Sequence, residues 1–497
     1  MVEPWKRTAV AKAAGGLRSP LFVLSPDVCA LDEVAARTFR GSPQSIARVG
    51  FAIAHRLAER APGVEGLSRG EAELAEAIAD ALAVSARPLV ISGTGCGSPE
   101  VLQAAANLAW SLVVAERDPA LWLALPECNS MGLAMLDAPP LEAAFTALEQ
   151  GEADTLVVLE NDLYRRLGQA TVDAALAGTE DLFLLDHLHH ATAEKARWLL
   201  PAATFAETDA TLVSAEGRAQ RAYKALPPGG EVREAWRWLR EIAAAAKGGG
   251  PEDTTFDAVT ARLAAALRAF GAIVAAAVES HAGKVPSRIP RATPRYSGRT
   301  AMDAQQDVKE QPPPRDPDSP FVYSMEGGTE ATPGGLAPWY WVPSWSSNEA
   351  LNRFQQEIPG PLRGSQPGVR LIEPVQARPR FFAEPPSPFE PRPERWLVLP
   401  LHHCLGSEEL SMQSEAIAQR APEPYLAVGR AAADQLGLAE GQPTELHIGG
   451  HVHVLPVRIH PALPGGTAGL PVGLPGLAGI ALPDWGELRP VAAPREG

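Results

Sequence analysis

The first half of the chain repeats a pattern: a short apolar run, a turn, and a segment with apolar residues at helical spacing. An apolar run at 88–92 leads through a glycine-rich turn into a helix, for which Ser98 supplies an N-cap and Pro99 the first helical position. The pattern returns at 154–167 and at 182–201. Three such β-then-α units predict a parallel, helix-covered sheet.

Ligands in parallel sheets bind beyond the carboxyl ends of the strands. The turns after Ser92, Glu160 and Asp186 are therefore the places where we expect any bound molecule.

Other segments have different patterns. Residues 31–60 and 231–280 carry apolar residues three and four apart and predict helices, the second set interrupted by a glycine-rich loop. The last hundred residues consist of short alternating runs broken by Gly and Pro, which predict a compact β-domain or barrel.

Proline makes up 48 of 497 residues, about twice the usual share, and is concentrated after residue 280. Residues 285–392 are therefore predicted to be non-helical, either as a disordered linker or as extended chain packed along a surface. The aromatic-rich segment 337–364 favours the second interpretation, because buried tryptophans stabilise order. The predicted organisation is an α/β core (1–230), a helical segment (231–284), a Pro-rich extended wrap (285–392) and a small C-terminal β-barrel-like domain (393–497).

The formal net charge of −15 disfavours nucleic acid and anionic membrane surfaces as partners, because both bind clustered Lys and Arg. No segment reaches the roughly 18 consecutive apolar residues of a membrane span. The N-terminus has basic residues but lacks the apolar run of a secretory signal. We therefore expect a cytoplasmic chain without direct membrane insertion, attached to a membrane at most through partners.

The cysteines are too few and too scattered for a cluster. Cys29, Cys96, Cys128 and Cys404 show no CxxC spacing, so we expect neither a disulfide scaffold nor a local zinc or iron–sulfur site.

Three glycines mark the turn after Ser92. Gly93, Gly95 and Gly97 would let backbone N–H groups approach a phosphate at the start of a helix. The spacing is GxGxG rather than the full dinucleotide pattern GxGxxG, and no acidic residue after a second strand would hold a ribose. We interpret the turn as structural or vestigial, with a nicotinamide site as the alternative.

Seven histidines could ligate a metal by side-chain chemistry. The HVH spacing places two rings on one face of a strand, but no further ligand follows at a recognisable distance. We interpret all of them as loop or surface residues and predict no metal ligand. They are His187, His189, His190, His402, His403, His451 and His453.

Charged residues are dense after the apolar strand end at 199–201. General acid or base chemistry would need a positioned carboxylate pair. An ion-paired loop that bridges two layers is the interpretation we favour, and we predict no catalytic residue. The residues concerned are Glu207, Asp209, Glu216, Arg218 and Arg221.

The segment LLPAATFAETDATLVSAEGRAQR (199–221) resembles a signature of molybdopterin oxidoreductases, in which an apolar strand end is followed by Glu, a turn, and Glu-Gly-Arg-x-Gln. Together with SGTGCGS, ALPECNSMG, YSGRTAM, DPDSPFVYSMEG, WVPSWSSNEALNRFQQEIPGPLRG and PLHHCLGSEELS, it resembles the C-terminal half of the G subunit of bacterial NADH-quinone oxidoreductase, respiratory complex I. The resemblance covers the chain from about residue 20 to the end.

The resemblance implies a molybdopterin-oxidoreductase-like core and a C-terminal domain like the family's molybdopterin-dinucleotide-binding barrel. The family's iron–sulfur clusters belong to its N-terminal half, so we expect none in this segment, and we expect the molybdopterin to have been lost. The positions that would have faced a pterin nucleotide are read as a retained, vestigial scaffold: Gly93, Gly95, Asn129, Asp162, Glu207 and Arg218.

Two residues depart from the family signature. Ala210 stands where relatives usually have Gly, and Ser214 where many have Asn. Ala210 argues against a positive φ angle or a close approach to a pterin at this point.

The resemblance implies a structural scaffold within the peripheral arm of complex I, in contact with other peripheral-arm subunits on the cytoplasmic side of the bacterial inner membrane. The alternatives are a molybdenum- or tungsten-dependent oxidoreductase like formate dehydrogenase, and an assembly protein outside complex I. We expect a fragment, a split-gene product or an internal-start form, and a sheet cut within a domain should make the isolated chain poorly soluble.

Overall fold

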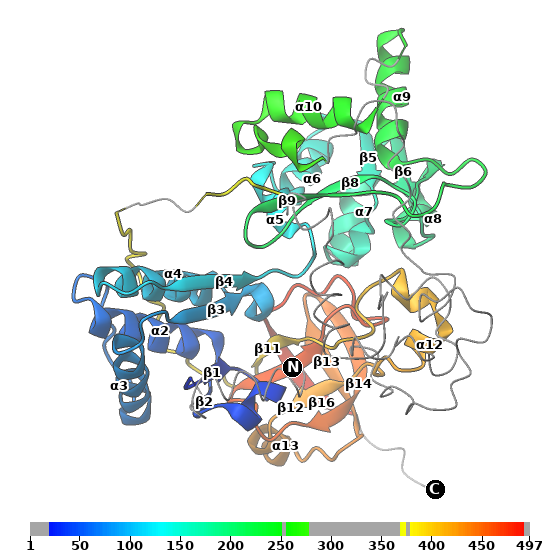
Figure 1. The fold of residues 1–497 in the computed structure, drawn as a ribbon. Helices are drawn as coiled ribbons and strands as arrows, with labels where there is room; N and C mark the ends of the chain where they lie inside the picture. Colours follow the sequence, from blue (N-terminus) through cyan, green and yellow to red (C-terminus); the bar gives the residue numbers. More distant parts are fainter. Residues whose placement is uncertain (1–18, 251–254, 278–367, 374–377, 492–497) are drawn as a thin grey trace, which may run out of the picture. The chain divides into compact units, whose positions relative to one another are not determined.

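The computed structural model describes residues 19–250, 255–277, 368–373 and 378–491. The chain forms two units, one of Pro20–Gly271 with Arg370–Gly497 and the other of Met1–Ser19 with Ala272–Val369. The second unit lies almost entirely outside the described residues; its described part includes the 3₁₀ helix η5 (Ile273–Ala276). The elements below lie in the first unit apart from Val369, and most of them are labelled in Figure 1.

Part of the predicted organisation stays a prediction. The aromatic segment 337–364 lies outside the described residues, as does most of the proline-rich wrap. The boundaries at 230, 284 and 392 likewise remain predictions. None of the helices in the described stretches is long and apolar enough to cross a bilayer.

The N-terminal elements are β1 (Phe22–Ser25), η1 (Ala30–Val34), β2 (Arg37–Arg40), α2 (Pro43–Leu57), α3 (Arg69–Ala83) and α4 (Pro99–Val114). β1 and β2 pair in parallel, and α2 packs against both α3 and α4 (Figure 1). Val49, Phe51 and Ile53 of α2 are buried there. Helix was predicted throughout 31–60, but only α2 is an α-helix, because Thr38 and Phe39 favour a strand and pair with β1.

The first predicted β-then-α unit is confirmed. β3 (Leu89–Gly93) runs through η2 (Thr94–Cys96) into α4, which begins at Pro99. Ser98 occupies the N-cap position, but its hydroxyl donates to Glu100 Oε2 at 2.6 Å and makes no capping hydrogen bond. β3 pairs in parallel with β4 (Ala120–Ala124), a strand that the sequence pattern did not predict.

The other two predicted units form a second parallel sheet, β5-β6-β7, made of β5 (Thr155–Leu159), β6 (Asp181–Asp186) and β7 (Trp198–Pro201). Helices before and between its strands contribute to its core. They are α6 (Leu141–Glu149), η3 (Leu163–Arg165), α7 (Gln169–Ala177) and α8 (Ala191–Lys195). The short helix α5 (Ser130–Met135) precedes α6. The predicted parallel strands are thus present but distributed over two sheets, because β3 pairs with β4 and the chain then passes through α5 and α6 before β5.

The charged segment forms a hairpin followed by helices. β8 (Ala210–Val213) pairs antiparallel with β9 (Arg218–Ala222). The helices predicted within 231–280 are confirmed as α9 (Ala235–Lys247) and α10 (Phe256–Ala266), with a short η4 (Arg268–Phe270) after them. In the described part of the predicted Pro-rich wrap (285–392), Val369–Arg370 form the short strand β10.

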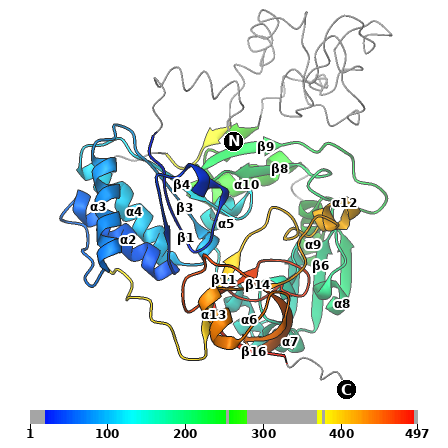
Figure 2. The same ribbon diagram turned by 90° about the horizontal axis from the view of Figure 1, so that it is seen from below.

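The C-terminal part is a closed barrel with the strand order β11-β15-β12-β14-β13-β16, which confirms the predicted barrel-like domain (Figure 2). Val398, Leu446 and Leu470 are fully buried in its interior. The strands are β11 (Trp396–Leu401), β12 (Leu426–Val428), β13 (Pro443–Ile448), β14 (His451–Ile459), β15 (Thr467–Pro471) and β16 (Asp484–Pro490), and η7 (Ser411–Gln413), α12 (Glu415–Ala418) and α13 (Arg430–Leu436) lie between them.

Leu446→Ala should destabilise the barrel by about 2–5 kcal/mol, because it leaves a cavity in a fully buried position. Amide hydrogen exchange of β13 and β16 measures this opening free energy directly. Val454→Ala on β14, where the side chain is 59% exposed, is the matched control and should change it by no more than about 0.5 kcal/mol. Equal exchange in the two variants would contradict the barrel packing.

Candidate functional site

Two aspartates meet one histidine at the carboxyl ends of β5 and β6. Asp162 follows β5, Asp186 ends β6, and His190 comes four residues later, just before α8. The distance from His190 Nε2 to Asp186 Oδ2 is 3.1 Å, and from His190 Nδ1 to Asp162 Oδ1 it is 3.4 Å. The three side chains are only 6–12% exposed. We call these residues the Asp–His–Asp cluster.

The chain itself donates to both carboxylates. Asp162 Oδ1 accepts hydrogen bonds from the buried Thr192 hydroxyl at 2.7 Å and from the Thr192 N–H at 3.3 Å. Asp186 Oδ1 accepts from the N–H groups of His187 and Leu188 at 2.7 and 2.9 Å. The cluster therefore joins β5, β6 and the start of α8 through internal bonds.

The charges in the cluster stabilise one another. Burial acts to lower the pKa of His190, but the hydrogen bonds and charges of Asp162 and Asp186 outweigh it and raise this pKa from 6.5 to about 9. Burial acts to raise the pKa of both aspartates, but the hydrogen bonds from His190 and from other donors outweigh it and lower both values. At neutral pH the cluster is an imidazolium between two carboxylates. Such a histidine has no free lone pair and cannot act as a general base.

The glycine turn lies against a loop of the barrel. A Cβ on Gly93 would collide with the Ala124 carbonyl oxygen, so this glycine permits the close pairing of β3 with β4. The Gly95 carbonyl oxygen lies 3.1 Å from His402 Nε2. Gly97 has a φ of 60°, and a Cβ there would lie 2.5 Å from Pro483 Cδ. Pro483 thus fills the space beside the turn.

The remaining predicted site residues make contacts within the chain. Asn129 Oδ1 accepts from the Val213 N–H at 2.8 Å and so attaches the start of α5 to β8. Glu207 Oε2 accepts from the N–H and the hydroxyl of Thr204 at 3.1 and 3.0 Å. Arg218 Nε donates to Glu216 Oε1 at 3.0 Å. Of the six predicted positions, only Asp162 belongs to the Asp–His–Asp cluster.

Of the five charged residues predicted to form an ion-paired loop, Glu216, Arg218 and Arg221 make ion pairs, but the two arginines lie on strand β9 rather than in a loop. Arg221 forms an ion pair with Asp257 of α10 at 2.9 Å and lies over the Phe256 ring at 4.2 Å. The Asp209 carboxylate accepts from the Lys224 N–H at 3.1 Å. Ala210 begins strand β8 and does not have a positive φ angle, in agreement with the absence of glycine there.

His190 lies in the loop between β6 and α8, in agreement with the interpretation of the seven histidines as loop or surface residues, but its side chain is only 12% exposed. Its imidazole is nearly buried because two carboxylates compensate the loss of water. His189 and His402 are exposed, and the rings of His451 and His453 share one face of β14 as predicted. Within the described stretches, no group of three or more His, Cys, Asp or Glu side chains could hold a metal ion.

The sequence carries a signal for the cluster that periodicity alone does not reveal. An Asp at the end of a predicted strand is followed four residues later by a His, and a second Asp stands just beyond the end of the preceding predicted strand. Adjacent parallel strands bring such ends together.

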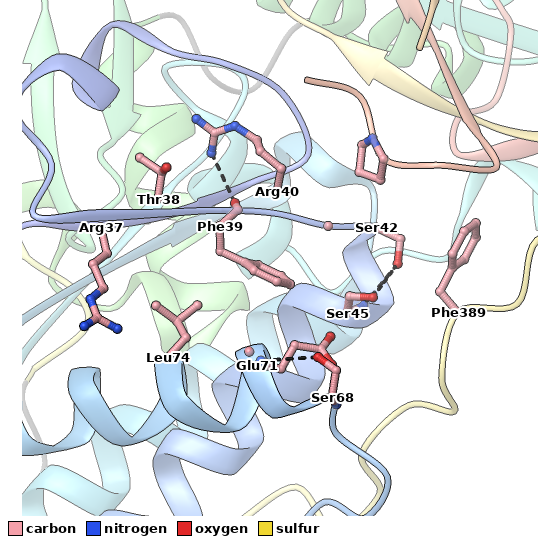
Figure 3. Close-up of a pocket in the computed structure, with 13 residues that line it drawn as sticks. Arg37, Thr38, Phe39, Arg40, Ser42, Ser45, Ser68, Glu71, Leu74 and Phe389 are labelled. Atoms are coloured by element: carbon pink, nitrogen blue, oxygen red, sulfur yellow. Dashed lines mark hydrogen bonds between the residues drawn. The ribbon is translucent and has the colours of Figure 1, made fainter. Parts of the chain in front are cut away.

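A separate cavity of about 600 Å³ opens beside β2 and the N-terminal ends of α2 and α3 (Figure 3). No predicted site residue lines it. Its helix ends are already capped, since Ser42 Oγ accepts from the Ser45 N–H and Ser68 exchanges hydrogen bonds with Glu71. Arg40 is paired with Asp32. These polar groups are satisfied within the chain, and nothing here singles out a ligand.

The predicted positions do not fit a pterin nucleotide. Such a ligand needs several polar groups turned toward it. The side-chain oxygens of Asp162, Asn129 and Glu207 instead accept hydrogen bonds from groups of the chain itself. Pro483 occupies the space beside the glycine turn.

Comparison with known proteins shows two kinds of similarity. Residues 69–245 match the molybdopterin oxidoreductase family. The G subunit of NADH-quinone oxidoreductase from Pseudomonas fluorescens is 42% identical over 482 residues, which are 96% of this chain and 53% of that protein. The corresponding protein of Salmonella typhimurium is 38% identical over 498 residues, 98% of this chain and 55% of that protein. The chain thus spans about half the length of these curated relatives.

Among solved structures, acetylene hydratase from Pelobacter acetylenicus aligns with 96% of this chain and 70% of its own, with a TM-score of 0.47 and 13% identity.

The Asp–His–Asp cluster should make stability depend on pH. Because the pKa of His190 is raised, its contribution is complete below about pH 6.5 and is lost as the pH rises through about 9. His190→Gln should therefore cost about 1–3 kcal/mol near pH 6 and progressively less toward pH 10. Hydrogen exchange of the β6 amides measures this free energy.

The exposed His189 provides the control, since His189→Gln should have no such pH-dependent effect. A cost of His190→Gln that is the same at pH 6 and pH 10 would contradict the charged cluster.

Gly97→Ala should loosen the contact between the glycine turn and the barrel loop. The positive φ alone costs about 1–2 kcal/mol, and the new methyl group would clash with Pro483. Gly70→Ala in α3 is the matched control, because a Cβ there meets nothing within 4 Å. We expect a lower melting temperature for the first variant and an unchanged or higher one for the second; equal melting temperatures would refute the packing.

Proposed function

Because the chain belongs, over the half of the protein that it spans, to the family of the NADH-quinone oxidoreductase G subunit, we propose that it is a structural part of that respiratory complex. It contains a molybdopterin oxidoreductase domain. The observation that carries the proposal is the Asp–His–Asp cluster. At the strand ends where this fold class binds ligands, the polar groups serve to hold the chain together.

The proposal includes loss of the molybdopterin. Two observations support this loss: the Asp162 carboxylate is hydrogen-bonded within the chain, and Pro483 fills the space beside the glycine turn. A bound nucleotide would have to displace these contacts. Electron transfer through this segment is not proposed either. Its four cysteines are all free and unclustered, and we expect the iron–sulfur clusters of the family in the other half of the protein.

The proposed partners are other subunits of the peripheral arm, on the cytoplasmic side of the inner membrane. The net charge of −15 supports attachment through protein contacts, since an acidic chain is repelled by anionic lipid. NADH oxidation and quinone reduction would then belong to the assembly.

A pterin-dependent oxidoreductase like formate dehydrogenase is not favoured. The relatives at 42% and 38% identity are both named as the G subunit of NADH-quinone oxidoreductase.

The proposal is tested by isolating the tagged chain from its own cells without overexpression. We expect it to co-purify with NADH-oxidising activity and with only traces of molybdenum, tungsten or fluorescent oxidised pterin. A parallel purification of the untagged strain controls for nonspecific capture. Stoichiometric metal and pterin would overturn the proposal, as would recovery of the chain free of any NADH-oxidising complex.

A further inference from the structure

The sheet β3–β4 has an uncovered apolar face. On the covered face, Val90 packs with Ala105 and Leu112 of α4. On the opposite face, Leu89 is 58%, Ile91 63% and Trp122 53% exposed. Ile91 and Trp122 are direct neighbours in the parallel register, so their side chains stand side by side.

Such a face is unusual for parallel strands. Parallel sheets are normally covered by helices on both faces, and their strands are rich in apolar residues, as LVISG and ALWLA are here. A sheet of only two strands also needs packing against other elements to be stable, and here α4 packs on one face only. The face therefore has the properties of an interface that another polypeptide completes.

One end of this face is polar. Arg87, just before β3, and Asp118, just before β4, form an exposed ion pair at 3.5 Å. An apolar centre bordered by charged residues is typical of protein–protein contacts.

We propose that the face formed by Leu89, Ile91 and Trp122 binds an amphipathic helix from the part of the G-subunit polypeptide that lies outside the matched half. The inference rests on the proposed function. We choose this helix as the binding partner because the relatives carry about as much polypeptide outside the match as inside it. The other face of the sheet is already covered by α4 (Figure 1). The helix would contribute aliphatic side chains to pack on Ile91 and Trp122.

The test is co-expression of the tagged chain with the remaining part of the Pseudomonas fluorescens relative. Ile91→Lys places a charge at the centre of the face and should reduce recovery of the untagged partner at least tenfold. Val452→Lys is the matched control, since Val452 is also an exposed residue on a strand, at 53%, but lies in the barrel. It should leave recovery unchanged.

Coverage of the face is measured separately. Ile91→Cys should react with a maleimide rapidly in the chain alone and at least tenfold more slowly in the pair, as read from the labelled peptide by mass spectrometry. Val452→Cys should react at the same rate in both. Because Ile91 is exposed, these variants should keep the circular dichroism spectrum of the unchanged chain.

The outcomes are distinct. If the two polypeptides associate but Ile91→Lys binds as well as the unchanged chain, this inference is overturned while the proposed function stands. If the unchanged chain is a dimer that Ile91→Lys makes monomeric, the occupant is a second copy and the inference is wrong. If the polypeptides do not associate at all, the inference is overturned, while the proposed function is decided separately by the purification from the chain's own cells.

Discussion

A charged group is costly to bury without a partner, and this rule governs the carboxyl end of the β5-β6-β7 sheet. Asp162 and Asp186 lie at the carboxyl ends of adjacent strands, where water is largely excluded. Two carboxylates so close together would repel each other, and the His190 imidazolium offsets this repulsion: its Nε2 bonds to Asp186 Oδ2 at 3.1 Å, and its Nδ1 forms an ion pair with Asp162 Oδ1 at 3.4 Å. The contacts that compensate for the burial of these three side chains also connect β5, β6 and the start of α8.

This arrangement uses the part of an α/β fold that is usually free for ligands. In many proteins of this class, backbone N–H groups and carboxylates at the strand ends remain unpaired until a nucleotide binds. Here the carboxylates are bonded to the chain, and Pro483 from the barrel loop packs beside the glycine turn. We propose that contacts within the chain have replaced those to a lost cofactor, which would leave the fold intact without its redox chemistry.

Periodicity predicted the elements that depend on local pattern. The strand, turn and helix around Pro99, the helices α9 and α10 and the C-terminal barrel are all present. Sequence did not reveal that β3 and β5 belong to different sheets, because strand pairing is decided by tertiary packing. The Asp–His–Asp cluster was missed for the same reason: Asp162 was identified from the resemblance, whereas the histidine beside it is 28 residues away in the sequence.

The most direct test of the account is the protonation state of His190. Selective ¹⁵N-histidine labelling, with His190→Gln to assign the signal, measures both ring nitrogens as the pH is raised. An imidazolium held between two carboxylates should keep both nitrogens protonated at pH 7.5 and lose one proton near pH 9. A neutral His190 ring at pH 7.5, with one unprotonated nitrogen available to a ligand, would contradict it.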